Sequence, residues 1–285
     1  FQDLIEKGSL VSLYDFENKL LIFPDVAPPQ KFCLFTSMGA YVVPVDERIP
    51  ADFAFFAHRV EDLLDVDRRF ILSADDIILL NPNTRTCPIF RSRRDAALTK
   101  ALYRRVPVLV REGDPSGNPW KVTFKQGLFN MANDSGLFQA KEELEAAGWV
   151  LHGNSFIRGK EMNVPVYEAK MFHQFDHRYN TYDGVPVASR FNVKAQAVTM
   201  DQVKSNPAST AMPRYWIECS SVDDAWFSDC DWMIAFRDIT NVNTNRRSAI
   251  FSALPKVGVG NVAPIAKVET HVPGGKELFL AAVNS

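Results

Sequence analysis

The chain lacks the features that would place it in a membrane or outside the cell. No apolar run is long enough to span a bilayer, and no segment has the layout of a secretory signal peptide. Cysteine is also scarce, because the four cysteines are scattered and form no CxxC pair. This scarcity argues against a disulfide scaffold and against a zinc ribbon. We therefore expect a cytoplasmic protein with reduced thiols.

The composition is that of a globular protein. Of the 285 residues, 46% are hydrophobic and 23% are charged, which suits one large domain or two ordinary ones. The chain begins at Phe1 with no initiator methionine, and residues 1–8 have the pattern of the end of a helix. We therefore expect the chain to be a piece of a longer protein.

The first half of the chain mixes strand and helix patterns. Residues 9–16 and 31–36 are short β-rich runs, and such a pair would finish an open sheet that needs partner strands from outside this chain. The spacing of apolar residues from 55 to 64 predicts a helix. Ser73, with an acid three residues later, predicts the N-cap of a second helix, which Pro82 ends.

A third predicted helix covers about residues 94–105. Its spacing predicts that Arg94, Arg104 and Arg105 face outward, while four apolar residues face the core. These four are Ala97, Leu98, Ala101 and Leu102.

The second half of the chain has mainly strand patterns. Residues 107–111 and 121–124 are predicted strands, and residues 138–147 are a predicted helix ended by Gly148. From Gly159 to the end the pattern is one of short strands and long polar loops. We therefore predict an α+β fold, mixed in its first half and β-rich in its second.

Positive charge gathers in one stretch of a chain whose formal net charge is −2. From Arg85 to Arg111 there are eight arginines and lysines and a single acid, Asp95, a local balance of +7. Phe90 and Tyr103 are interleaved with these cations. A strip of this density predicts contact with a polyanion, above all nucleic acid. The alternative is a solvated helix face beside a basic loop.

Three motifs, in this order, carry a resemblance to a known family. They are LNPNTRTCPIFRSRRD at residues 80–95, VYEAKMFHQFDHRY at 166–179 and FRDITNVNTNRRSAIFSALPKVGVGN at 236–261. Together they resemble the C-terminal half of adenine N6 DNA methyltransferases of the type IIG layout, which act in restriction-modification and phage defence. The resemblance covers most of residues 9–265.

The resemblance implies a division of the chain and a partner. Residues 1–53 would be the last strands of the methyltransferase sheet, and residues 54–285 the target-recognition domain that binds double-stranded DNA. S-adenosylmethionine would be the cofactor of the parent enzyme. The cofactor motif and the catalytic tetrapeptide are missing here, so we expect no cofactor in this chain. The catalytic half, on the same chain or as a separate subunit, would be its partner.

The segment from Asn81 to Thr84 does not replace the catalytic tetrapeptide. That motif needs an aromatic ring at its fourth position to stack on the flipped adenine, and Thr84 supplies none. We therefore assign no catalytic residue and no metal ligand. The expected DNA-binding residues are Asn81, Asn83, Thr84, Arg85, Arg91, Arg93, Arg94, Arg104, Arg105, His173, His177, Arg178, Arg237, Asn243, Asn245, Arg246 and Arg247.

Two pairs of residues in the second motif suggest other chemistry. His173 and His177 stand four apart, as in a helical metal site, but no third ligand is evident, so they fit a DNA groove or a turn near Asp176 better. Glu168 and Lys170 could begin a Mg²⁺-dependent nuclease site if a second acid such as Asp134 lay nearby. A cross-strand ion pair is the plainer interpretation. A protein-interaction module without DNA binding is the third hypothesis.

The loop from 241 to 247 lies between apolar runs and carries asparagines and arginines. These are the side chains that pair with adenine and guanine through two hydrogen bonds in the major groove. A hairpin loop rich in turn-forming residues has the same composition, so both interpretations stand.

Without the cofactor and catalytic motifs, we expect the isolated chain neither to bind S-adenosylmethionine nor to methylate DNA. Titration calorimetry with the cofactor should give no saturable heat, and a methyl-transfer assay on duplex DNA should give no product. Stoichiometric cofactor binding would contradict the assignment of the chain to a recognition half.

Overall fold

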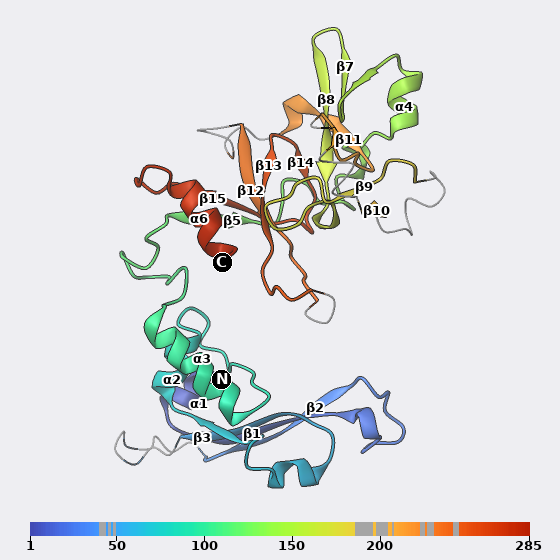
Figure 1. Cartoon of the computed structure of the whole chain (residues 1–285). Helices are drawn as coiled ribbons and strands as arrows, with labels where there is room; N and C mark the ends of the chain where they lie inside the picture. Colours follow the sequence, from blue (N-terminus) through green and yellow to red (C-terminus); the bar gives the residue numbers. More distant parts are fainter. Residues whose placement is uncertain are drawn as a thin grey trace. The chain divides into compact units, whose positions relative to one another are not determined.

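A computed structural model describes most of the chain. The described residues are 1–39, 44, 47, 50–185, 196–197, 205–206, 208–222, 226, 231–241 and 245–285. They form two compact units, Phe1–Asn118 and Pro119–Ser285. Helices and sheets occur in both units, and the fold is α+β, as predicted (Figure 1).

The first unit is a four-stranded sheet with its α-helices on one side (Figure 1). The strand order is β2-β1-β3-β4, and β1 is antiparallel to β2 but parallel to β3. The strands are β1 (Leu10–Glu17), β2 (Lys31–Ser37), β3 (Ala51–Ala57) and β4 (Phe70–Leu72). The helices are α1 (Gln2–Glu6), α2 (Ala74–Leu80), α3 (Arg93–Arg105) and the short 3-10 turns η1 (Asn18–Leu20) and η3 (Val60–Leu64).

The start of α2 follows the predicted capping pattern. The Ser73 hydroxyl accepts a hydrogen bond from the backbone nitrogen of Asp76 at 3.1 Å, and the Asp76 carboxylate accepts one from the nitrogen of Ser73 at 3.2 Å. This reciprocal pair satisfies two backbone donors that the first turn of a helix leaves open. The prediction of a helix that begins after Ser73 and ends before Pro82 is confirmed.

The predicted helix at 55–64 is wrong. Residues 55–57 belong to β3, and residues 60–64 form η3. Because β3 lies between β1 and β4, it is buried at almost every position, with Phe53 fully buried and Phe55 nearly so. A strand covered on both faces loses the alternating pattern and looks like a buried helix in the sequence.

The predicted boundary at residue 53 also differs from the structure. Residue 53 falls in the middle of β3, which pairs with β1 on one side and with β4 on the other. The helices α2 and α3 pack on this same sheet, so the first unit extends to Asn118.

The α3 helix exists, but its predicted inner face is wrong. Of its residues only Ala96 is buried, and Leu98 and Leu102 are 59% and 51% exposed. The helix turns Ala96 and Tyr103 toward the core, about half a turn from the predicted face. An apolar stripe therefore remains on the surface of the first unit.

The second unit holds two larger sheets. One has the order β11-β8-β7-β6, with β14 pairing in parallel with β8, and the other has the order β13-β12-β15-β5. The first sheet and its partners are β6 (Val150–His152), β7 (Ser155–Arg158), β8 (Glu161–Tyr167), β11 (Trp216–Glu218) and β14 (Gly258–Val259). The second sheet is β5 (Val122–Lys125), β12 (Trp232–Phe236), β13 (Phe251–Pro255) and β15 (Ile265–Val268). A small pair is β9 (Asn180–Thr181) with β10 (Gln196–Ala197).

The larger hydrophobic core of the second unit joins strands of both sheets. Residues from β8, β12, β13 and β15 meet in it, including Val166, Met233 and Ile265. The short helices around it are α4 (Lys141–Ala146), η4 (Ser135–Leu137), η5 (Ala169–Met171) and η7 (Cys219–Ser221). Residues 107–111, predicted as a strand, form none in the structure.

A C-terminal helix, α6 (Gly275–Val283), was not predicted. It packs on β13 and β15 through Phe279, which is fully buried against Phe251 and Trp120. The buried side chain of Asn284 then exchanges hydrogen bonds with both the nitrogen and the carbonyl of Phe251, each at 3.1 Å. These bonds tie the end of the chain to the first residue of β13.

No helix among the described residues combines the length and the apolar character needed to cross a membrane.

The core of the first unit gives a stability prediction. Phe53→Ala should lower the free energy of unfolding by about 3–5 kcal/mol, because it empties a fully buried site. Ile71→Ala, on the neighbouring strand but 58% exposed, should change it by less than about 1 kcal/mol. Urea unfolding followed by circular dichroism measures both, and similar losses in the two variants would contradict the placement of β3 at the centre of the sheet.

Candidate nucleic-acid interface

Residues from separate predicted segments meet in the second unit. The segment after β8 supplies His173 and Tyr179, the end of β12 supplies Arg237, and the connection from β12 to β13 supplies Asn245. The His173 and Tyr179 rings lie 4.7 Å apart, and the Arg237 guanidinium lies 5.6 Å from the Tyr179 ring. Within the cluster, Asn245 Nδ2 lies 2.9 Å from His173 Nε2.

The contact with Asn245 defines the state of His173. An amide nitrogen can only donate, so His173 Nε2 accepts and its ring is neutral, with the proton on Nδ1. Burial lowers the pKa of His173 from its usual 6.5, and the nearby positive charge of Arg237 lowers it further. Burial also lowers the pKa of His177. Both rings are therefore held mostly neutral near pH 7.

Backbone hydrogen bonds hold the segment that carries the two histidines in a tight turn. The nitrogen of His173 donates to the carbonyl of Asp176 at 2.7 Å, and the nitrogen of Asp176 donates back to the carbonyl of His173 at 2.9 Å. The Asp176 carboxylate accepts from the nitrogen of Arg178 at 2.8 Å. The predicted turn near Asp176 is confirmed, and this turn excludes the helical spacing that a histidine metal pair needs.

Three arginines of this region bind backbone carbonyls. Arg237 donates through Nε to the carbonyl of Phe172 at 2.9 Å, and burial lowers its pKa. Arg178 donates to the carbonyl of Ser209 at 3.1 Å, and Arg247 to the carbonyl of Asn284 at 2.8 Å. Each of these three thus fastens one piece of backbone to another.

Arg246 differs from the other arginines of this region. It is exposed and has no hydrogen-bond or ion-pair partner among the residues that the structure describes. Tyr179, 38% exposed, and Phe175, 59% exposed, also reach solvent from the neighbouring turn. Asn243, predicted to contact DNA, lies outside the described residues.

The cations of the predicted basic strip in the first unit make several separate local contacts. Arg85 pairs with Glu6, and Arg91 lies 4.9 Å from the Phe56 ring. Arg104 lies 3.6 Å from one carboxylate oxygen of Asp76, and Lys100 lies 3.0 Å from the other. The strip therefore does not form one continuous row of unpaired cations.

Three arginines of α3 remain available to a partner. Arg93 donates to the carbonyl of Arg69 through Nε at 3.3 Å, so only its two terminal nitrogens are open. Arg94 and Arg105 are exposed and have no polar partner within the described parts of the chain. They are eleven positions apart on one helix face, about 16 Å along the axis.

The polar residues before the strip act within the turn. Asn81 donates to the carbonyl of Thr86 at 3.0 Å, and Thr84 contacts the Thr86 hydroxyl at 3.0 Å. The Asn83 amide donates to the carbonyl of Val110 and accepts from the nitrogen of Glu112, both at 2.9 Å. These contacts brace two loops against each other, so the side chains of Asn81, Asn83 and Thr84 are used within the fold.

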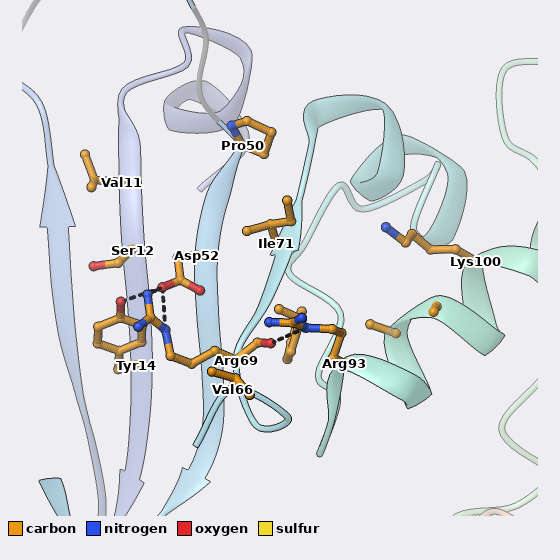
Figure 2. Close-up of a pocket in the computed structure, with 13 residues that line it drawn as sticks. Val11, Ser12, Tyr14, Pro50, Asp52, Val66, Arg69, Ile71, Arg93 and Lys100 are labelled. Atoms are coloured by element: carbon orange, nitrogen blue, oxygen red, sulfur yellow. Dashed lines mark hydrogen bonds and ion pairs between the residues drawn. The ribbon is translucent and has the colours of Figure 1, made fainter. Parts of the chain in front are cut away.

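A groove of about 830 Å³ opens between the sheet of the first unit and α3 (Figure 2). At one end Asp52 accepts hydrogen bonds from the Tyr14 hydroxyl at 2.7 Å and from Arg69 Nε at 2.8 Å. Burial and the neighbouring carboxylate raise the pKa of Tyr14. The three residues come from β1, β3 and the start of β4, and no sequence pattern links them.

The Glu168 carboxylate lies at the end of β8 in a buried network. Arg214 donates to it through Nε at 3.1 Å and through Nη2 at 2.6 Å, and the Tyr182 hydroxyl donates at 3.1 Å. Lys170 Nζ lies 3.3 Å away. The side chains of Glu168 and Arg214 are only 8% and 13% exposed, so the pair is shielded from solvent.

This network leaves the nuclease alternative without support. A metal at Glu168 would have to displace two bonds from Arg214, and Asp134 is used instead to accept from the nitrogen of Asn130 at 2.7 Å. Among the described residues no group of three or more His, Cys, Asp or Glu side chains is placed to hold a metal ion. Glu168 and Lys170 form an ion pair, but Lys170 lies in η5, so the pair is a local one and not the expected cross-strand pair.

Comparison with models of known protein families, with curated proteins and with solved structures finds no match to this chain.

The buried network gives the next prediction. Glu168→Gln should lower the free energy of unfolding by about 3 kcal/mol, because it leaves the Arg214 charge buried without its partner. The control is Glu161→Gln, which breaks an ion pair with Arg158 that is about half exposed, and it should cost less than about 1 kcal/mol. Chemical unfolding of both variants measures the difference, and equal losses would show that the Glu168 pair is solvated.

Proposed function

We propose that the chain is the DNA-binding and target-recognition portion of a site-specific adenine N6 DNA methyltransferase of the type IIG restriction-modification or phage-defence group. The observation that carries the proposal is the meeting of the second and third motifs in one cluster of the second unit. His173 and Tyr179 come from the second motif, and Arg237 and Asn245 come from the third. Contacts between the two motifs join Tyr179 to Arg237 and His173 to Asn245.

The cluster suits DNA recognition because hydrogen bonds hold its backbone in place and a guanidinium and aromatic rings are exposed beside it. Backbone carbonyls anchor Arg237 and Arg247, and the Asp176 turn anchors the aromatic side. Side chains presented from such a base lose little conformational entropy on binding. The exposed groups beside it are a guanidinium, that of Arg246, and the rings of Phe175 and Tyr179.

The hydrogen bonds also select among the residues of the 241–247 loop. Both ends of the Asn245 amide are occupied, Nδ2 by His173 and Oδ1 by the nitrogen of Arg247 at 3.2 Å. Arg247 is bound to Asn284. Arg246, with no partner among the described residues, therefore has all of its donors open to a guanine edge or a phosphate, whereas Arg247 has already committed Nη1 to the backbone. Asn245 and Arg247 would position it.

The first unit would add contacts that carry no sequence information. Arg94 and Arg105 are exposed on one face of α3, and phosphates need only such positive charge. With neither the cofactor motif nor the catalytic tetrapeptide in this chain, methyl transfer from S-adenosylmethionine would occur on the catalytic half. A cytoplasmic location belongs to the same proposal.

The test is binding of labelled duplex DNA by the isolated chain at several salt concentrations. We expect affinity to fall steeply with salt, and Arg246→Gln to weaken binding. The matched control is Arg158→Gln, an exposed arginine on the β7 strand outside the cluster, which should bind like the parent chain. If Arg246 meets a phosphate, the slope of log K against log salt should fall by about one.

Selection from a randomised duplex pool then separates base reading from phosphate contact. If Arg246 reads a base, Arg246→Gln should cost about 1–3 kcal/mol on the selected site and little on scrambled DNA. An unchanged discrimination ratio would make Arg246 a phosphate contact. The absence of any salt-dependent duplex binding by the parent chain would refute the proposed function and favour a protein-interaction module.

A further inference from the structure

The groove of the first unit has an aliphatic floor that is open to solvent (Figure 2). Val11, Val66 and Ile71 line it and are 42%, 65% and 58% exposed. Ala97 of α3 lines the facing wall. A small molecule would leave much of so open a surface wet, whereas a chain segment lying along the groove would bury it.

Cations outnumber acids in the lining. Arg69, Arg93 and Lys100 line the groove. Arg69 is paired with Asp52 and Lys100 with Asp76, so Arg93 is the lining cation without an acidic partner among the described residues. Figure 2 shows Arg69 turned to Asp52 and Arg93 turned to the carbonyl of Arg69, so both guanidinium groups are held in place. Guanidinium groups fixed in this way bind carboxylates with little further loss of side-chain freedom.

The aromatic side chains of the groove do not suit a nucleic-acid base. Phe70 is only 3% exposed, and the Arg69 guanidinium lies 5.9 Å from the centre of the Tyr14 ring. Binding of unpaired bases depends on open ring faces for stacking. The floor is instead aliphatic, and the open cation of the lining is Arg93, whose terminal nitrogens have no partner among the described residues.

From this charge and shape we propose that the groove is a docking site for an acidic peptide segment of another protein. An aliphatic side chain of the segment packs on Val66 and Ile71, and one of its carboxylates pairs with the open terminal nitrogens of Arg93. The site is separate from the cluster around His173, and it does not depend on the proposed DNA binding.

The experiment measures binding of a fluorescein-labelled synthetic peptide by anisotropy. The probe is about 12 residues of glutamate and leucine, spaced so that the leucines share one helix face. We expect saturable binding to the full chain. Ile71→Ser and Arg93→Gln should each weaken it about tenfold, through loss of aliphatic burial and of a carboxylate partner.

Two neighbouring substitutions are matched controls. Leu98→Ser changes an aliphatic residue of nearly equal exposure, 59% against 58%, that does not line the groove. Arg94→Gln removes an arginine adjacent in sequence to Arg93 that is also outside the lining. Both should bind the peptide like the parent chain. Ile71→Ser should also keep the parent affinity for duplex DNA, which separates this site from DNA binding.

Several results would overturn the proposal. One is no saturable peptide binding, and another is equal weakening by Leu98→Ser and Ile71→Ser. Displacement of the peptide by duplex DNA would assign the groove to nucleic acid. A dimer in analytical ultracentrifugation that Ile71→Ser dissociates would assign it to a second copy of the chain. A control peptide of glutamate and serine that binds equally well would show charge attraction without a docking site.

Discussion

The buried ion pair of Glu168 and Arg214 sets the geometry on which the second unit depends. Glu168 follows β8 directly and Arg214 precedes β11, so the pair closes the end of the ladder between these strands. From that point the chain leaves the sheet, forms η5 and enters the turn that carries His173. Because a buried carboxylate is stable only when its oxygens are satisfied, Arg214 and Tyr182 together fix where that segment can begin. The cluster with Arg237 and Asn245 is built on this fixed start.

Many of the arginines predicted to bind DNA make contacts within the fold, and few of them remain open to a partner. The strip from Arg85 to Arg111 looks like a single basic surface in the sequence. In the structure Arg85 and Arg104 pair with acids, and Arg91 lies over a ring. The same holds in the second unit, where Arg237 is bound to a backbone carbonyl. The cations left for a ligand are therefore few and well separated. A polyanion would meet individual guanidinium groups, each with a distinct neighbourhood, and not a uniform positive patch.

Local signals in the sequence predicted the elements that depend on near neighbours. The Ser73–Asp76 capping pair predicted the start of α2, and two short β-rich runs predicted the strands that pair as β1 and β2. The errors fell where burial is decided by distant parts of the chain. β3 lost its alternation because side chains on both of its faces are buried in the folded unit. α6 was missed because the residue that anchors it, Phe279, finds its partners only in the folded second unit.

The sequence by itself determined the α+β class, the concentration of positive charge before and within α3, and the polar loop that joins β12 to β13. These features follow from composition and from the spacing of nearby residues, so they can be inferred before the fold is known. Only the tertiary structure decided which cations stay open to a partner. It also decided that Glu168 pairs with Arg214, and that Tyr14, Asp52 and Arg69 meet at one end of a groove. The reason is that hydrogen bonds and ion pairs act over a few ångströms, and residues far apart in the chain reach that distance only when the sheets have formed.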